Sequence, residues 1–254
     1  MWLCAYGHRL IHNGPSMDWY KGWFKMSTRF LRNKDLIDQD NLTDICIIGA
    51  GGIGSFLLQG LTIMGWNDII VWDGDDVAEH NLSSTAYSAN MVGRPKIDAA
   101  GVLHSLYAGP EQTLTCYQRK WLPFESAHPR TIVCTDDMES RRNVFNKWAA
   151  LDNKDFFIDG RMGATTVELA TETNRVFEHR YMDEWIPTDS VPEAPCSMKH
   201  TVFGAQHIAA QIVAQVYNIV GNLAYYDYIH TSLSPTLVTF GNLIIPKTDT
   251  EEYC

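Results

Sequence analysis

The sequence lacks the patterns that define several common classes of protein. Its 254 residues include six cysteines, but these are dispersed and form no C-x-x-C pair, so neither a structural zinc site nor a dense disulfide framework is predicted. No run of about 18 apolar residues occurs, so we predict no membrane span. The N-terminus shows no basic n-region and no small-residue cleavage site, so we expect no secretory signal and a reducing, cytoplasmic environment.

Positive charge is also scarce. The chain has 20 Lys+Arg against 30 Asp+Glu, for a formal net charge of −10. Non-specific binding of nucleic acid needs a basic surface that displaces counterions, so this composition argues against a nucleic-acid partner. A local basic pocket for a small anion and a basic protein partner both stay open. The apolar fraction of 45% can build a sizeable core, and the length favours one α/β domain with an appendage.

The N-terminal part differs from the rest of the chain. Residues 1–26 are rich in aromatic residues but show little periodicity, so we predict an irregular arm followed by a single domain over residues 27–254. A Ser/Thr cap candidate and spaced apolar positions predict a short helix over 27–41.

Strand and helix patterns then alternate. A buried-strand pattern over 45–48 leads through a glycine-rich turn into a helical pattern that ends at Gly65, and a second strand pattern over 69–72 stops at Asp73. This order is a βαβ unit. Further strands are predicted at 114–117, 131–134, 156–158, and as a terminal pair at 237–240 and 243–245. Further helices are predicted from Pro95 (apolar face Ala99, Val102, Leu103 and Leu106), over 141–151 and over 200–220.

These elements predict a Rossmann-like α/β fold, with a mostly parallel, twisted sheet and helices on both faces. The helix predicted over 200–220 is mostly apolar, so it is expected to be buried in the core or at a subunit contact.

The glycine-rich turn is the first candidate site. Gly49, Gly51 and Gly54 form a G-x-G-x-x-G pattern between a strand and a helix, and Asp73 ends the next strand. Glycines let the backbone approach phosphate oxygens, the helix N-terminus stabilises their charge, and the acid accepts hydrogen bonds from ribose hydroxyls. A turn that merely connects strand to helix is the alternative. The motif alone does not separate NAD from ATP, so an NAD-dependent oxidoreductase stays open at this point.

Three further sequence motifs distinguish an ATP site from an NAD site. They follow the glycine turn in order: D-x-D-x-V-x-x-x-N-L from Asp73, G-x-P-K from Gly93, and D-(D/N)-x-x-x-R from Asp136. With G-x-G-G-x-G-S from Gly49, this ordered set resembles the ThiF/MoeB/HesA family of ATP-dependent adenylyltransferases, which includes ubiquitin-activating enzymes. The resemblance covers roughly residues 27–220.

The resemblance implies an adenylation domain that binds ATP and Mg²⁺, with one role for each matched position. The glycine turn would cradle the nucleotide and Asp73 would hold the ribose, while Asp136 would bind Mg²⁺ with ATP. The complete set implied for nucleotide binding is Gly49, Gly51, Gly52, Gly54, Asp73, Asp75, Asn81 and Lys96, with Asn81 and Lys96 facing the phosphates. Arg32 ends an R-F-L-R element similar to the family's R-Y-x-R, whose second arginine reaches the phosphates of a neighbouring subunit.

The chemistry implied by the resemblance is adenylation of a carboxylate. The carboxylate attacks the α-phosphate, and Lys96, Arg32 and Mg²⁺ would neutralise the charge that builds on the phosphoryl oxygens and pyrophosphate. No general base is needed, because the nucleophile is already an anion at neutral pH. Each residue also has a plainer interpretation: a solvated Lys96, a helix cap formed by Asp136 and Asp137, and a surface Arg32.

Three positions leave alternatives open. Ser84 stands where the family has an arginine that contacts the phosphates, so another cation (Arg94 or Arg161) takes its place, or the enzyme is slow, or adenylation is lost. Cys196 lies in a Pro-rich loop where many relatives carry a cysteine that receives an acyl or persulfide group, although an ordinary loop thiol is the alternative. Arg161, within 159–163, either binds the incoming carboxylate or belongs to a simple turn.

The sequence therefore predicts an ATP-dependent adenylyltransferase. Its substrate is expected to be the C-terminus of a ubiquitin-like or sulfur-carrier protein or a peptide, with transfer through Cys196. A catalytically degenerate nucleotide-binding regulatory or scaffold protein is the alternative. Relatives are commonly homodimers, so a homodimer is expected.

Overall fold

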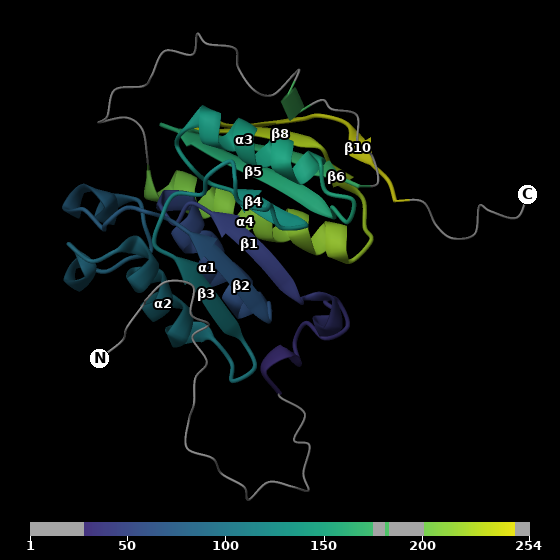
Figure 1. Ribbon diagram of the computed structural model, residues 1–254. Coiled ribbons are helices and arrows are strands. Elements are labelled where there is room, and N and C mark those ends of the chain that lie inside the picture. Colours follow the sequence, from purple (N-terminus) through teal and green to yellow (C-terminus); the bar gives the residue numbers. More distant parts are fainter. Residues whose placement is uncertain (1–27, 175–180, 183–200, 247–254) are drawn as a thin grey trace, which may run out of the picture.

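The computed structural model describes residues 28–174, 181–182 and 201–246 (Figure 1). The arm predicted over residues 1–26, and Cys196, lie outside the described residues. No helix in the described ranges is long and apolar enough to cross a membrane.

The described residues form an eight-stranded mixed sheet with the order β3-β2-β1-β4-β5-β6-β8-β9. The strands from β3 to β5 are parallel, and β6, β8 and β9 continue the sheet antiparallel. The bounds are β1 Asp44–Ile48, β2 Asp68–Trp72, β3 Thr113–Tyr117, β4 Arg130–Val133, β5 Phe156–Gly163, β6 Thr166–Thr173, β8 Tyr228–Leu233 and β9 Thr236–Phe240. The prediction of a mostly parallel, Rossmann-like α/β fold is confirmed.

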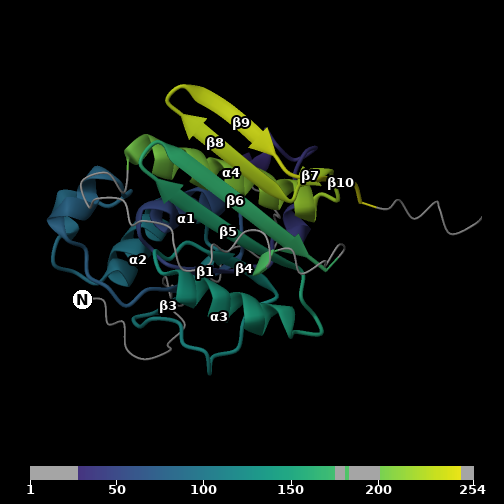
Figure 2. The same ribbon diagram turned by 90° about the horizontal axis from the view of Figure 1, so that it is seen from above.

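Helices cover both faces of the sheet. α1 (Gly52–Met64), α2 (Lys96–Tyr107) and α4 (Val202–Val220) lie on one face, and α3 (Met138–Ala149) lies on the other (Figure 2). The alternation of side chains along β1 explains how one strand serves both layers. Ile45 and Ile47 join the core under α1 and α4, whereas Cys46 and Ile48 join the core under α3.

The N-terminal helix predicted over 27–41 is absent. The chain forms two 3-10 turns there, η1 (Thr28–Phe30) and η2 (Gln39–Asn41). Leu31 is 56% exposed and Leu36 is 67% exposed, so two of the spaced apolar positions of this segment do not pack on the core. Packing of an apolar face supplies most of the stability of short helices.

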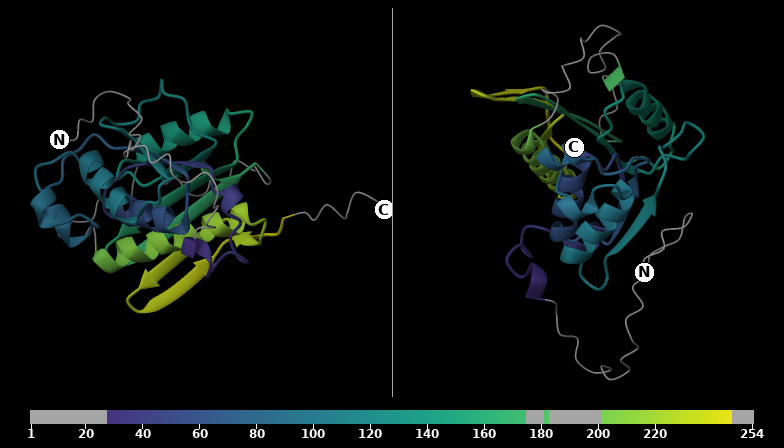
Figure 3. Two further views of the ribbon diagram at one scale, coloured as in Figure 1. Left: turned by 90° about the horizontal axis from the view of Figure 1, so that it is seen from below. Right: turned by 90° about the vertical axis from the view of Figure 1, so that its left-hand side faces the viewer.

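The two strands predicted at 237–240 and 243–245 are present, but they do not pair with each other. β9 pairs with β8 in the main sheet, while β10 (Leu243–Ile244) pairs with β7 (Tyr225–Tyr226) in a separate two-stranded ladder. Figure 3 shows the yellow β8–β9 hairpin extending beyond the helices at one side. The strand predicted at 156–158 is longer than expected, because residues 159–163 continue β5 and pair with β6.

The apolar face predicted for the helix after Pro95 is only partly right. Val102 is 39% exposed and Leu106 is 70% exposed, while Lys96 and His104 are buried. The helix therefore presents a polar side chain to the interior at each end.

Candidate nucleotide site

The glycine turn between β1 and α1 is closed by contacts between backbone atoms. Gly49 has a φ of +99°, and a Cβ added there would lie 2.9 Å from the carbonyl group of Cys134, in the loop after β4. A Cβ on Gly54 would lie 1.9 Å from the carbonyl oxygen of Gly49. Both positions therefore require glycine for the fold of the turn itself.

Gly51 and Gly52 face a different environment. Gly51 precedes α1 with no side-chain cap, and nothing lies within 4 Å of the point where its Cβ would be. A Cβ on Gly52 would lie 3.1 Å from the carbonyl oxygen of Ser84. The N-terminus of α1 therefore opens beside Gly51, and the positive end of a helix favours a negatively charged group.

Asp73, at the end of β2, ties the turn to the next strand. Its Oδ2 accepts a hydrogen bond from the backbone of Ala50 at 2.7 Å, and its Oδ1 accepts one from the backbone of Asp75 at 2.8 Å. Burial raises the pKa of this carboxyl group, against the opposing effects of Lys96 and the two backbone donors. The acid predicted to hold a ribose thus also holds the glycine turn in place.

Lys96 is a buried residue, not a solvated one. Backbone hydrogen bonds between Val77 and Arg94, and between Asp75 and Lys96, bring the start of α2 beside the segment after β2. The side chain is 11% exposed, and Nζ lies 2.8 Å from Oδ2 of Asp75 and 3.8 Å from Oδ1 of Asp73. The hydrogen bond from Lys96 lowers the pKa of Asp75. An ammonium group is therefore fixed beside the glycine turn.

The two acids after β4 have separate roles in the structure. Asp137 caps α3, accepting hydrogen bonds from the backbone of Glu139 at 3.1 Å and of Ser140 at 2.9 Å. Asp136 is exposed and takes no part in that cap. No group of three or more candidate ligands gathers in the described part of the chain, so Asp136 offers a single carboxylate. This suits Mg²⁺, which commonly takes one or two carboxylates together with substrate phosphates.

Sequence reasoning missed Lys120. A Cβ on Gly74 would lie 3.0 Å from the backbone nitrogen of Lys120, which follows β3. The hydrogen bond from Lys96 lowers the pKa of Asp75 most, and that from Ser140 lowers the pKa of Asp137 most, but the charge of Lys120 lowers both. Its position next to β2 depends on the strand order, which no local motif records.

The segment from Asn81 to Ser84 is a compact turn. Oδ1 of Asn81 accepts a hydrogen bond from the backbone of Ala78 at 3.0 Å, within η3 (Glu79–Ser83). Ser84 is 4% exposed. Arg161, one of the two cations considered as a substitute, donates from Nε to Asp159 at 2.8 Å within β5. Arg94 is exposed in the turn before α2.

Arg32 lies at the opposite edge of the sheet from the glycine turn. Its neighbour Arg29 donates hydrogen bonds to the carbonyl oxygens of Thr62, at 3.2 Å, and Tyr107, in the last turns of α1 and α2. Arg32 itself is exposed. The structure therefore does not bring it to Lys96 of the same chain, and its predicted action on a neighbouring subunit stays a prediction.

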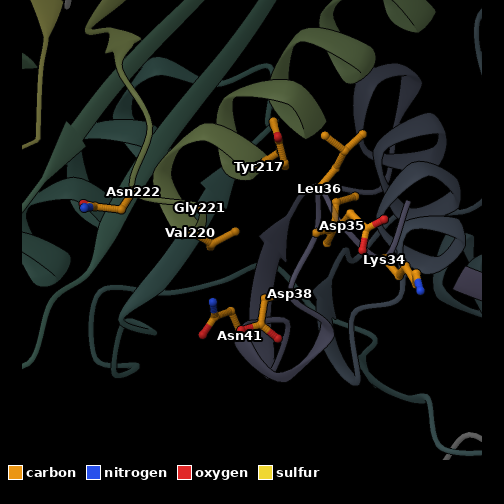
Figure 4. A pocket seen from close by; sticks show the side chains of 10 residues that line it. Lys34, Asp35, Leu36, Asp38, Asn41, Tyr217, Val220, Gly221 and Asn222 are labelled. Atoms are coloured by element: carbon orange, nitrogen blue, oxygen red, sulfur yellow. The ribbon is translucent and has the colours of Figure 1, made fainter. Parts of the chain in front are cut away.

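A cavity of about 350 Å³ also lies at that opposite edge. Figure 4 shows the segment before β1, with Asp35 and Leu36, beside Tyr217 in the last turn of α4. None of the residues implied in nucleotide binding lines it.

This chain belongs to the ThiF family, whose model matches residues 33–242. It is 32% identical over 79 residues to tRNA threonylcarbamoyladenosine dehydratase of Bacillus subtilis (strain 168), a match that covers 29% of this chain and 31% of that protein. It is also 32% identical over 65 residues to ubiquitin-like modifier-activating enzyme 5 of Caenorhabditis briggsae, covering 25% of this chain and 15% of that protein.

Solved structures share the fold. E. coli MccB, in a crystal structure with ATP, is 18% identical with a TM-score of 0.67, and the match covers 89% of this chain and 73% of MccB. The matched stretches thus span less than a third of each of the two curated relatives, and about three quarters of MccB.

Two glycine variants should separate folding from binding. Gly54→Ala is expected to destabilise the protein by about 1–3 kcal/mol, the usual cost of overpacking, because its Cβ meets the carbonyl oxygen of Gly49. Gly51→Ala should destabilise the protein less than Gly54→Ala, because its Cβ meets no neighbouring atom and only the N-cap conformation at φ −80° and ψ −144° disfavours alanine, yet it should weaken ATP binding. Thermal unfolding and calorimetric titration with MgATP measure both effects. Equal unfolding temperatures for the two variants would contradict the role given to Gly54.

Proposed function

We propose that this protein is an ATP-dependent adenylyltransferase that activates a carboxylate. The observation that carries the proposal is the fixed ammonium group of Lys96, held between Asp73 and Asp75 beside an uncapped helix N-terminus. This arrangement offers positive charge and backbone donors to a polyphosphate. Membership of the ThiF family supports ATP as the nucleotide.

The residues of the chain would divide the work. The glycine turn receives the phosphates, and Asp73 holds the ribose while keeping the turn in place. Lys96 turns from Asp75 to the phosphates and stabilises the charge that grows on them. Asp136 holds Mg²⁺, which supplies further neutralisation of the triphosphate when bound. The attacking carboxylate oxygen bonds to the α-phosphorus as pyrophosphate leaves, giving an acyl adenylate.

The acceptor we propose is the C-terminal carboxylate of a ubiquitin-like or sulfur-carrier protein or of a peptide, followed by transfer through Cys196. Two relatives support this class by name: one activates a ubiquitin-like modifier, and MccB is also solved with MccA-N7isoASN. We also propose that residues 27–254 act as one adenylation domain and that the protein works as a homodimer.

A degenerate nucleotide-binding protein with a regulatory or scaffold role is the second candidate. Ser84 favours it, because a hydroxyl cannot neutralise charge as the family's guanidinium does. The buried position of Lys96 opposes it. An ammonium group that is only 11% exposed loses hydration, and a protein without a use for this charge would have no reason to keep it there.

Pyrophosphate exchange into ATP separates the two candidates. With carboxylate-terminated peptides present, the wild type should exchange, and Lys96→Met should lose about 100-fold or more of the rate because a charge contact to the phosphates is gone. Lys147→Met, at an exposed lysine in the last turn of α3, is the matched control and should keep the rate. ATP binding without exchange for any carboxylate would favour the degenerate protein, and NAD binding without ATP binding an oxidoreductase.

Mixing two inactive variants tests whether Arg32 acts on the neighbouring subunit. Arg32→Ala and Asp136→Asn should each exchange poorly alone. In random mixed dimers, one site per mixed dimer has both groups, so activity should return to about a quarter of the wild-type level. An Arg32→Ala variant that exchanges like the wild type would place Arg32 outside the reaction, and a mixture as inactive as its components would place it in the site of its own subunit.

Restoring the family's arginine tests the departure at position 84. Ser84→Arg is expected to raise the exchange rate by about tenfold or more, because it returns a guanidinium beside the N-terminus of α1. Ser84→Met, which adds bulk without charge, is the control for the buried position. A faster Ser84→Met, or no gain with arginine in a folded variant, would show that charge at this position is not limiting.

A further inference from the structure

The loop after β4 is fixed on both sides of Asp136. The backbone nitrogen of Cys134 donates to the carbonyl oxygen of Ile48 at 2.8 Å. The carbonyl oxygen of Thr135 accepts a hydrogen bond from Nη2 of Arg141, and the side chain of Asp137 caps α3. Asp136, which is exposed and does not cap α3, therefore sits on a backbone that neighbouring residues hold.

Arg141 contacts two backbone carbonyl oxygens and one carboxylate. Besides Thr135, its guanidinium donates from Nη1 to the carbonyl oxygen of Gly160 at 3.2 Å and pairs with the carboxylate of Asp159. Arg141 is 4% exposed and Asp159 is 0% exposed. Burial lowers the pKa of Arg141 to about 10, so the guanidinium stays charged at neutral pH.

Asp159 in turn is held by two other side chains. Its Oδ2 accepts a hydrogen bond from Nε of Arg161 at 2.8 Å and one from the hydroxyl of Tyr181 at 2.6 Å. Tyr181 is fully buried against Phe145 and Phe157. The acid that orients Arg141 is therefore locked from the opposite side, and the guanidinium has little freedom to turn.

We propose that Arg141 is a positioning residue for Asp136, and that it sets the affinity of the nucleotide site for Mg²⁺ with ATP. This inference rests on the proposed nucleotide function. A planar guanidinium reaches two carbonyl oxygens and a carboxylate at once, which a single ammonium group on a flexible stem does not do. When a residue that orients a metal ligand through hydrogen bonds is replaced, metal affinity typically falls by about 10- to 100-fold.

A purely structural role predicts a different pattern. Arg141 would then stabilise the fold, and its replacement would weaken all properties of the protein alike. A positioning role predicts a loss confined to the part of ATP binding that depends on Mg²⁺, and a loss that disappears when Asp136 is already gone.

The test compares Arg141→Lys, Asp136→Asn and the double variant. Calorimetric titration measures ATP affinity with Mg²⁺ and with EDTA, and amide hydrogen exchange of the protein without ligand measures the protection of residues 134–137. Arg130→Lys is the matched control. Arg130 begins β4, the strand that leads into this loop, so it lies at the end of the strand away from Asp136, where it pairs with Asp155 at 2.7 Å.

Arg141→Lys should lower the Mg²⁺-dependent part of ATP affinity by about tenfold, leave the affinity in EDTA unchanged, and speed exchange at 134–137. The double variant should bind like Asp136→Asn alone, and Arg130→Lys should match the wild type in all three measurements. Additive losses, or unchanged exchange at 134–137 in Arg141→Lys, would overturn the inference. A wild type that binds no ATP would instead overturn the proposed function, with the exchange measurement still deciding whether Arg141 holds the loop.

Discussion

The candidate site depends on one close approach between backbones, at Gly49. A Cβ there would lie 2.9 Å from the carbonyl group of Cys134, and the φ of +99° is rarely open to other residues. Through this contact the turn that leads into α1 lies against the loop that carries Asp136. Any side chain at position 49 would push apart the two elements that the family resemblance assigns to phosphate and to Mg²⁺.

The parallel half of the sheet could be predicted because its strands are buried on both faces. Such strands form uninterrupted apolar runs, as at 45–48 and 69–72, which stand out against any background. The antiparallel half could not, because β6 buries polar residues. Glu172 is 4% exposed and accepts a hydrogen bond from the backbone of Tyr181, and Thr171 accepts one from Gln215. Hydrogen-bond partners distant in the sequence satisfy these buried polar side chains, so the hydropathy pattern alone does not predict β6.

The site could be predicted where its residues belong to local motifs and not where they meet through the strand order. The glycine turn and Asp73 belong to one βαβ unit, and Lys96 begins α2, the helix that follows it in the chain. Lys120 comes after β3, the strand that follows α2. For residues 159–163 the sequence left open a simple turn or a carboxylate site at Arg161, but the structure continues β5 through Asp159 and Gly160. A Cβ on Gly160 would lie 2.7 Å from Cδ1 of Ile212, so the missing side chain lets α4 pack closely against the sheet.

Carboxylates outnumber lysine side chains at the carboxyl edge of the sheet, so a bound triphosphate would need positive charge from Mg²⁺ or from another subunit. Among the residues described there, Lys96 lies beside Asp73 and Asp75, the charge of Lys120 acts on Asp75 and Asp137, and Asp136 adds a further exposed carboxylate. The chain as a whole has the same negative sign, with a net charge of −10. A triphosphate adds to this excess, and position 84 offers a hydroxyl where the family has a guanidinium. Two sources would correct the deficit: Mg²⁺ held through Asp136, and Arg32 from a neighbouring subunit, since Arg32 lies at the opposite edge of the sheet from the site of its own chain. Binding of Mg²⁺ depends on the orientation of the exposed carboxylate of Asp136. The buried ion pair between Arg141 and Asp159 fixes the loop that carries this carboxylate, so it would help to supply the missing positive charge.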